Sequence, residues 1–154
     1  MTTSHPNRPP RVVVGVDGSE SSKQALRWGA HLAASAGARL DAVAAWQYPS
    51  TWGWGAVPLG WSPGQDMEKA LTEAVDEVFG TERPDDMRVA VREGYAAAVL
   101  LHECEDALML VVGSRGHGGF AGLLLGSVSA NVAEHATCPV LVVHGDHLPP
   151  EGPA

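Results

Sequence analysis

The sequence predicts an α/β fold built on an open, five-stranded parallel sheet with helices on both faces. Short apolar segments alternate with helical segments from Arg11 to Val143, and such alternation is typical of parallel sheets. Several of the apolar segments have no polar alternation, as expected for strands buried on both faces. Ligands of such sheets bind beyond the carboxyl ends of the strands, where the strand order reverses.

The chain begins its ordered part with a strand, a turn and a helix. Residues 11–16 are an apolar strand, residues 17–19 a turn, and residues 22–36 a helix. Ser19 is suited to the N-cap because its hydroxyl can accept a backbone N–H, and Gly37 is suited to the helix stop.

A second strand is expected over residues 40–46, and a long segment rich in Gly, Pro and Trp follows it. Residues 47–63 are predicted to be irregular and contain Trp52, Trp54 and Trp61. Irregular segments of this length are uncommon in compact domains. The tryptophans can pack the segment onto the domain, shield a bound ring or form a partner surface, and the sequence leaves these alternatives open.

The rest of the chain continues the alternation of helices and strands. The expected elements are helices at 65–79, 95–104 and 127–136 and strands at 88–91, 107–112 and 140–143. One domain is therefore predicted over residues 11–145. Residues 1–10 and 146–154 are polar and rich in Pro, so we expect both ends to be flexible.

Composition excludes several classes of function. The formal net charge of -8 disfavours duplex nucleic acid as a partner, because binding to phosphates needs a basic face. No apolar run approaches the ~20 residues of a membrane span, and the amino terminus lacks the apolar core of a secretory signal, so a cytoplasmic protein is expected. Cys104 and Cys138 stand alone, which argues against a disulfide scaffold or a zinc site.

The most informative stretch is a glycine-rich segment that directly follows the strand at 107–112. Its spacing is G-x-x-G-x9-G-S, formed by Gly113, Gly116, Gly126 and Ser127. Glycines let backbone N–H groups approach a ligand, and a helix that begins near Ser127 directs unpaired N–H groups and partial positive charge at an anion. Each glycine taken alone is more simply a loop-forming residue, but together they predict a phosphate site.

Two other phosphate motifs do not fit this segment. A Walker A loop needs a Lys before the Ser, and none precedes Ser127. A dinucleotide fingerprint normally follows the first strand and has an acidic ribose partner downstream, whereas here a single helix and strand remain.

These segments resemble the universal stress protein family, in its nucleotide-binding form. The resemblance rests on residues 12–19, 113–129 and 138–143 and spans about Arg11 to Val143. It implies a Rossmann-like sheet in the order 3-2-1-4-5 and an ATP ligand with Mg²⁺. The adenine-nucleotide site is then expected to comprise Gly15, Val16, Asp17, Ala45, Val112, Gly113, Ser114, Arg115, Gly116, Gly126, Ser127, Val128 and Ser129.

Individual residues of this expected site also have simpler interpretations. Asp17 can hold Mg²⁺ indirectly through the nucleotide or can act only in the turn. Ala45 can line the adenine pocket or be a small strand residue. Ser127 can bind phosphate and serve as the N-cap, and His117 is expected to be solvated rather than catalytic.

The resemblance implies a nucleotide-dependent stress-response regulator or sensor with at most slow ATP hydrolysis. Near the glycine segment the sequence offers only Asp17, Arg115 and His117 for chemistry, which is too little for fast phosphoryl transfer. A genuine ATPase or kinase-like enzyme and a cyclic AMP-binding protein remain alternatives. A homodimer through residues 139–144 is also expected, because this apolar edge strand has no Lys to guard it.

Overall fold

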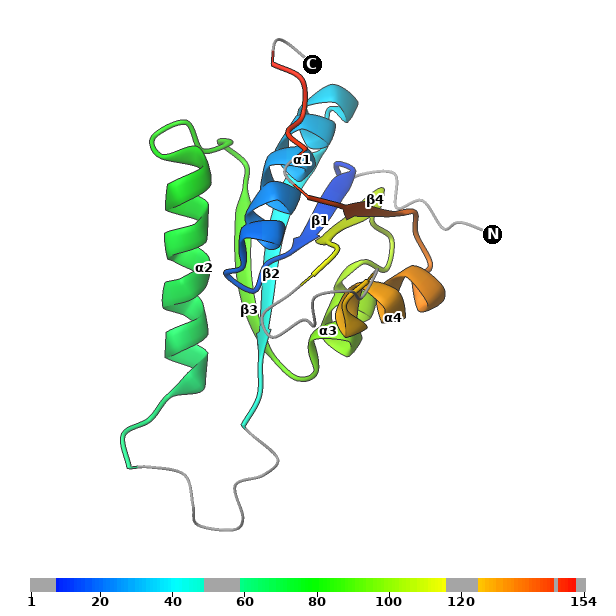
Figure 1. Ribbon diagram of the computed structural model, residues 1–154. Helices are drawn as coiled ribbons and strands as arrows, with labels where there is room; N and C mark the ends of the chain where they lie inside the picture. Colours follow the sequence, from blue (N-terminus) through cyan, green and yellow to red (C-terminus); the bar gives the residue numbers. More distant parts are fainter. Residues whose placement is uncertain (1–7, 49–58, 116–124, 146, 152–154) are drawn as a thin grey trace.

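The computed structural model describes residues 8–48, 59–115, 125–145 and 147–151 (Figure 1). Within them, five parallel strands form one sheet in the order β3-β2-β1-β4-β5. The strands are β1 (Arg11–Gly15), β2 (Arg39–Trp46), β3 (Arg88–Glu93), β4 (Met109–Gly113) and β5 (Val140–Val143). The predicted fold class and strand order are confirmed. The chain order reverses between β1 and β4, which places the expected crevice at their carboxyl ends.

Helices cover both faces of the sheet. They are α1 (Glu20–Ala36), α2 (Pro63–Phe79), α3 (Ala96–Glu103) and α4 (Ser127–His135). The first two helices pack together on one face, and α3 and α4 pack together on the other (Figure 1). No helix in the described part of the chain combines the length and the hydropathy that a bilayer span requires.

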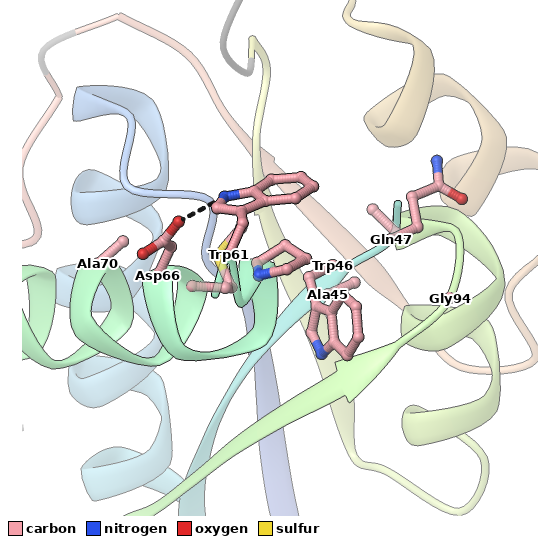
Figure 2. A pocket seen from close by; sticks show the side chains of 10 residues that line it. Ala45, Trp46, Gln47, Trp61, Asp66, Ala70 and Gly94 are labelled. Atoms are coloured by element: carbon pink, nitrogen blue, oxygen red, sulfur yellow. Dashed lines mark hydrogen bonds between the residues drawn. The ribbon is translucent and has the colours of Figure 1, made fainter. Parts of the chain in front are cut away.

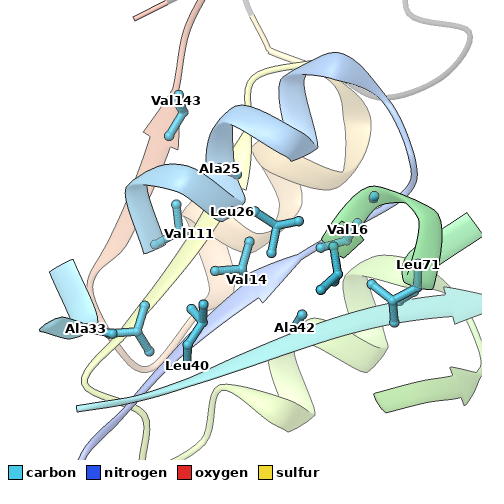
Figure 3. Packing of buried hydrophobic residues seen from close by; sticks show 14 residues of the cluster. Val14, Val16, Ala25, Leu26, Ala33, Leu40, Ala42, Leu71, Val111 and Val143 are labelled. Atoms are coloured by element: carbon cyan, nitrogen blue, oxygen red, sulfur yellow. The ribbon is translucent and has the colours of Figure 1, made fainter. Parts of the chain in front are cut away.

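Two apolar cores lie on opposite sides of the central strand. Val12 and Val14 of β1 belong to the core beneath α1 and α2, whereas Val13 belongs to the core beneath α3 and α4. Figure 3 shows Leu26 of α1 close to Val14 in the first core. Because successive strand residues serve different cores, both faces of β1 must be apolar, which explains its uninterrupted valine run.

Helix and strand ends differ from the prediction by a few residues. Ser19 is the N-cap of α1 and Gly37 its left-handed C-cap, as predicted, but the helix begins at Glu20 rather than at residue 22. Helix α2 begins at Pro63 instead of residue 65. Its N-cap, Ser62, accepts the N–H of Gln65, and proline suits the first helical position because its missing N–H has no intrahelical partner there.

Strand β4 begins two residues later than predicted. The N–H of Ala107 donates to the carbonyl of Cys104 at 3.0 Å, and Asp106 has a positive φ of 63°. A turn therefore occupies the position at which the apolar pattern alone indicated strand. Strand β3 is two residues longer than predicted and ends at Glu93.

Charged side chains close the amino end of the sheet. Asp41 of β2 accepts from Arg39 at 2.7 Å and 3.0 Å and from Arg11 of β1 at 3.5 Å. A second guanidinium nitrogen of Arg11 donates to the carbonyls of Glu103 and Glu105, where α3 ends. The hydrogen bonds to Asp41 raise the pKa of Arg39 above its already high usual value. This amino-end network joins two strands to a helix end.

Candidate functional site

Two helices begin at the carboxyl end of the sheet, beside the β1–β4 pair. Helix α1 follows β1 after the turn at residues 16–19, and α4 begins at Ser127. The carboxyl ends of β1 and β4 are adjacent, with Val14 opposite Val111. The helix starts therefore converge on one edge, and their hydrogen bonding decides which of them is open to a ligand.

The start of α1 is capped by a side chain of its own turn. Asp17 Oδ1 accepts from the backbone N–H of Ser19 at 2.9 Å and from the Ser19 hydroxyl. Ser19 Oγ accepts the N–H of Ser22 at 3.2 Å. The predicted site residue Asp17 thus organises the turn and the cap of this helix.

Within the part of the chain that the structure describes, the start of α4 has no such cap. Gly126 is its N-cap residue, with φ -69° and ψ 166°, and no side chain makes a capping hydrogen bond. Among the described residues no acceptor meets the N–H groups of Ser127, Val128 and Ser129. Three N–H groups and the positive end of the helix are therefore available to an anion.

The prediction that Ser127 is the N-cap was wrong, because Ser127 is already the first helical residue. This shift does not move the expected donors. The N-cap residue, Gly126, has no side chain, so it cannot accept a hydrogen bond from the N–H groups of the first helical turn. A serine at the cap would have occupied one of the N–H groups.

Hydrogen bonds clasp the two ends of the glycine-rich segment together. The N–H of Gly126 donates to the carbonyl of Ser114 at 2.7 Å, and the N–H of Ser114 donates to the carbonyl of Val143 at 2.9 Å. The buried hydroxyl of Ser129 lies 3.1 Å from the Ser114 carbonyl and 3.0 Å from the Gly126 carbonyl. Ser129 was expected to offer its hydroxyl to a ligand; here that hydroxyl secures the clasp and the N–H remains available.

Close packing between β4 and α1 fixes where the glycine-rich segment begins. A Cβ added at Gly113 would lie 2.2 Å from Ser21 Oγ and 2.7 Å from the Ser21 carbonyl carbon. The N–H of Arg115 donates to Ser21 Oγ at 3.4 Å. Sequence analysis did not single out Ser21; the signal available was its place in the first turn of a helix that faces the site.

The other predicted residues fall into packed positions around the crevice. A Cβ on Gly15 would lie 2.7 Å from Leu100, so this glycine makes room for α3. Val16 donates its N–H to the carbonyl of Val43 at 2.9 Å and is buried, as is Val112. Ala45 is half-buried against the core beneath α3 and α4. The remaining predictions, for Gly116, His117, Trp52 and Trp54, lie outside the described residues.

The described residues contain no group of three or more His, Cys, Asp or Glu side chains placed to hold a metal ion. Asp17 is the one carboxylate in the expected site, and its Oδ1 is engaged by Ser19. This donor set fits Mg²⁺ that is carried by nucleotide phosphates, with Asp17 as a distant partner, better than Mg²⁺ held by the protein itself.

A cavity of about 390 Å³ lies at the carboxyl ends of β2 and β3, beside the first turns of α2 (Figure 2). Its walls include Ala45 and Trp46 of β2, Trp61, and Asp66 and Ala70 of α2. Ala45 is the one predicted site residue that lines it. Sequence analysis noted the tryptophans of this region but did not predict the cavity, because its walls come from segments far apart in the chain.

Comparisons with known proteins agree on one family. The model of the universal stress protein family matches residues 10–144. A universal stress protein of Mycolicibacterium smegmatis is 37% identical over 145 residues, covering 91% of this chain and 47% of its own length. One from Mycobacterium tuberculosis is 38% identical over 142 residues, covering 90% of this chain and 46% of its own. The chain thus spans about half the length of the curated relatives it matches.

Solved structures of similar fold include nucleotide complexes. A universal stress protein in complex with cAMP is 31% identical, with a TM-score of 0.65, and the match covers 90% of this chain and 98% of that one. A universal stress protein from Archaeoglobus fulgidus in complex with dAMP has a TM-score of 0.63 at 20% identity, over 87% and 96% of the two chains. The latter supports the fold alone.

Proposed function

Because the chain belongs to the universal stress protein family, we propose that it binds adenine nucleotides, with ATP as the leading ligand, at the carboxyl ends of β1 and β4. The observation that carries this proposal is the uncapped start of α4. The N–H groups of Ser127, Val128 and Ser129, which have no acceptor among the described residues, directly follow the segment with the G-x-x-G-x9-G-S spacing. Phosphate oxygens are the acceptors that such a helix start accommodates.

The rest of the crevice supports a nucleotide rather than a free anion. Asp17 and the backbone of Gly15 and Val16 lie at the end of the neighbouring strand, β1. Ala45 lies at the end of the next strand, β2, and contributes a small side chain. Gly15, Asp17 and Ala45 are half-buried rather than fully buried, so part of their surface can contact a base and a sugar beside the α4 start.

Cyclic AMP is a second candidate ligand. The cAMP complex of a 31% identical universal stress protein favours it, whereas the three adjacent N–H groups of α4 favour a ligand with more phosphate oxygens. Calorimetric titrations with ATP, AMP and cyclic AMP under one set of conditions separate the candidates. A tenfold preference corresponds to about 1.4 kcal/mol.

A role as a regulator or sensor fits the described chemistry better than rapid turnover. Of the candidates for catalysis, Asp17 is committed to Ser19, and no metal-binding cluster lies in the described residues. We therefore expect phosphate release from ATP far below the roughly 10 per second of an ordinary enzyme. Turnover near that rate, lost on Asp17→Asn, would instead establish the ATPase alternative.

We also propose that the protein forms a homodimer through β5. This strand lies at one edge of the sheet, and its residues Val140, Leu141 and Val142 are only half-buried within one chain. Unpaired apolar edges favour pairing with a second copy. Val142→Lys should shift light-scattering mass toward the monomer, whereas Val89→Lys on the opposite edge strand, β3, should not.

Proline at the first helical position tests the phosphate site cleanly. Ser127→Pro removes one N–H from the start of α4, and the helix tolerates it because Gly126 already has extended φ and ψ. We expect ATP affinity to fall about tenfold, as for the loss of a charge-assisted hydrogen bond. Glu20→Pro makes the same change at the self-capped α1 and should leave affinity unchanged. Equal effects of the two variants, or none from Ser127→Pro, would refute the site.

A further inference from the structure

The cavity beside α2 shares Ala45 with the expected nucleotide site, but the rest of its lining comes from other residues. Its volume of about 390 Å³ falls within the ~300–1,000 Å³ typical of small-molecule pockets. Most of the lining is apolar or aromatic, from Trp46, Trp61, Pro63, Met67 and Ala70. Pockets of this kind take their specificity from the few polar groups placed among the apolar walls.

The two tryptophans that line the cavity are joined through a third aromatic ring, that of Tyr48. Trp46 and Tyr48 meet edge to face with centroids 5.4 Å apart and an interplanar angle of 83°. Tyr48 and Trp61 meet in the same way at 5.9 Å and 72°. Trp46 also lies against the backbone of Gly64, where an added Cβ would come within 3.0 Å of its ring. Two indoles from different segments are thus held at one opening.

Among the described residues that line this cavity, Asp66 has the single charged side chain, and it is an acid. Asp66 Oδ2 accepts the indole N–H of Trp61 at 3.1 Å, which fixes both groups (Figure 2). No Lys or Arg is among the lining residues, and the chain as a whole carries a net charge of -8. The remaining carboxylate oxygen, Oδ1, has no hydrogen-bond partner among the described residues.

We propose that this cavity binds a small organic cation, of the class of quaternary ammonium ions and alkylated amines. Aromatic faces attract such cations through their ring quadrupoles, and the cations shed water more readily than a primary ammonium or a metal ion. The Asp66 carboxylate supplies the complementary charge, and the apolar walls contact the alkyl groups. Among the described residues, Ala45 alone belongs to both sites, and binding of the cation can be measured without any nucleotide present.

Choline and its uncharged carbon isostere, 3,3-dimethyl-1-butanol, test the proposal directly. Indole N–H signals in proton–nitrogen NMR spectra report on the cavity, because Trp46 and Trp61 both line it; Trp61→Phe assigns one of them. We expect choline to shift these signals saturably and the neutral alcohol to bind at least about fivefold more weakly.

Asp66→Asn keeps the shape of the side chain and removes its charge. It should weaken choline binding about fivefold and leave the neutral alcohol unaffected. Glu68→Gln removes a charge from the same helix at a position that does not line the cavity, and it should change neither. Equal affinity for choline and the alcohol, equal effects of the two variants, or no choline-dependent shift would overturn the proposal. ATP affinity should be measured on the same variants. A failure of the cation proposal can then be distinguished from a failure of the nucleotide proposal.

Discussion

The two ends of the sheet differ in how completely their polar groups are hydrogen-bonded or ion-paired. At the amino end, the Asp41 carboxylate pairs with both Arg39 and Arg11, and Arg11 also donates to the carbonyls at the end of α3. At the carboxyl end, the start of α4 keeps N–H groups without acceptors among the described residues. The polar groups at the amino end therefore contribute to stability, whereas those at the carboxyl end are available to a ligand. Substitutions at the amino end should change the free energy of unfolding and leave binding unchanged.

Asp41→Ala should produce the largest effect and test whether the amino end serves stability alone. Two partly buried guanidinium groups, of Arg11 and Arg39, would lose their partner. We expect the free energy of unfolding to fall by about 3 kcal/mol, measured by urea denaturation. Asp85→Ala, which removes an exposed acid from the segment before β3, is the control and should cost little. Reduced ATP affinity in the folded Asp41 variant would break the separation between the two ends.

Gly113→Ala should reduce both stability and nucleotide binding, because it disturbs the packing of β4 against α1 at the carboxyl end of the sheet. The new methyl would overlap the side chain and backbone of Ser21 at the start of α1. Overpacking of this kind costs about 2 kcal/mol, and displacement of α1 from β4 should weaken nucleotide binding. Adding Ser21→Gly to the variant removes part of the overlap and should restore part of the stability. An unchanged free energy of unfolding in Gly113→Ala would mean that α1 can move away from β4 at no cost in stability.

Ser129→Ala should cost about 1 kcal/mol, the usual net value of one buried hydrogen bond. The hydroxyl lies within hydrogen-bonding distance of the Ser114 and Gly126 carbonyls, at the two ends of the glycine-rich segment, and its one proton is shared between them. Hydrogen exchange at the Gly126 amide should quicken, since the clasp at its own 2.7 Å bond is loosened. Ser127→Ala is the matched control, because it removes an adjacent hydroxyl and leaves the clasp. Unchanged exchange in the Ser129 variant would show that the backbone bond suffices.

The smallest effect on stability at neutral pH is expected at Cys138, which lies just before β5 at the amino end of the sheet. Burial, and after it a hydrogen bond with Cys104, raises the pKa of the Cys138 thiol from 9.0 to about 11. Alkylation of Cys138, followed by mass spectrometry, should therefore stay slow until pH approaches 11. The folded state holds this proton longer than the unfolded state, so the contribution to stability is complete below about pH 9 and is lost as pH rises toward 11. Rapid alkylation at pH 8 would contradict this account.

The sequence predicted those features that depend on local pattern. Neighbouring residues were enough to predict three of them. These are the valine run of β1, the cap at Ser19 and the glycine spacing after β4. The start of α2 at Pro63 was missed, since proline was taken as part of the irregular segment although it is favoured at the first helical position.

Features that depend on register between distant segments could not be predicted in this way. The Arg11–Asp41 contact requires the pairing of β1 with β2, and the approach of Ser21 to Gly113 requires α1 to pack on β4. The cavity beside α2 likewise needs Trp46, Trp61 and Gly94 to be brought together. Strand order itself came from the family resemblance, because alternation alone does not distinguish one parallel order from another.

Under the nucleotide proposal, the start of α4, which has no cap among the described residues, would link ligand binding to stability. An anion bound there would satisfy the N–H groups of the first turn, so occupancy and folding would be linked equilibria. A ligand that binds only the folded state adds about 2.7 kcal/mol when its free concentration is about 100 times its Kd. Under the nucleotide proposal, resistance to heat and to proteolysis would then rise and fall with the cellular nucleotide pool, without any change in the amount of protein synthesised.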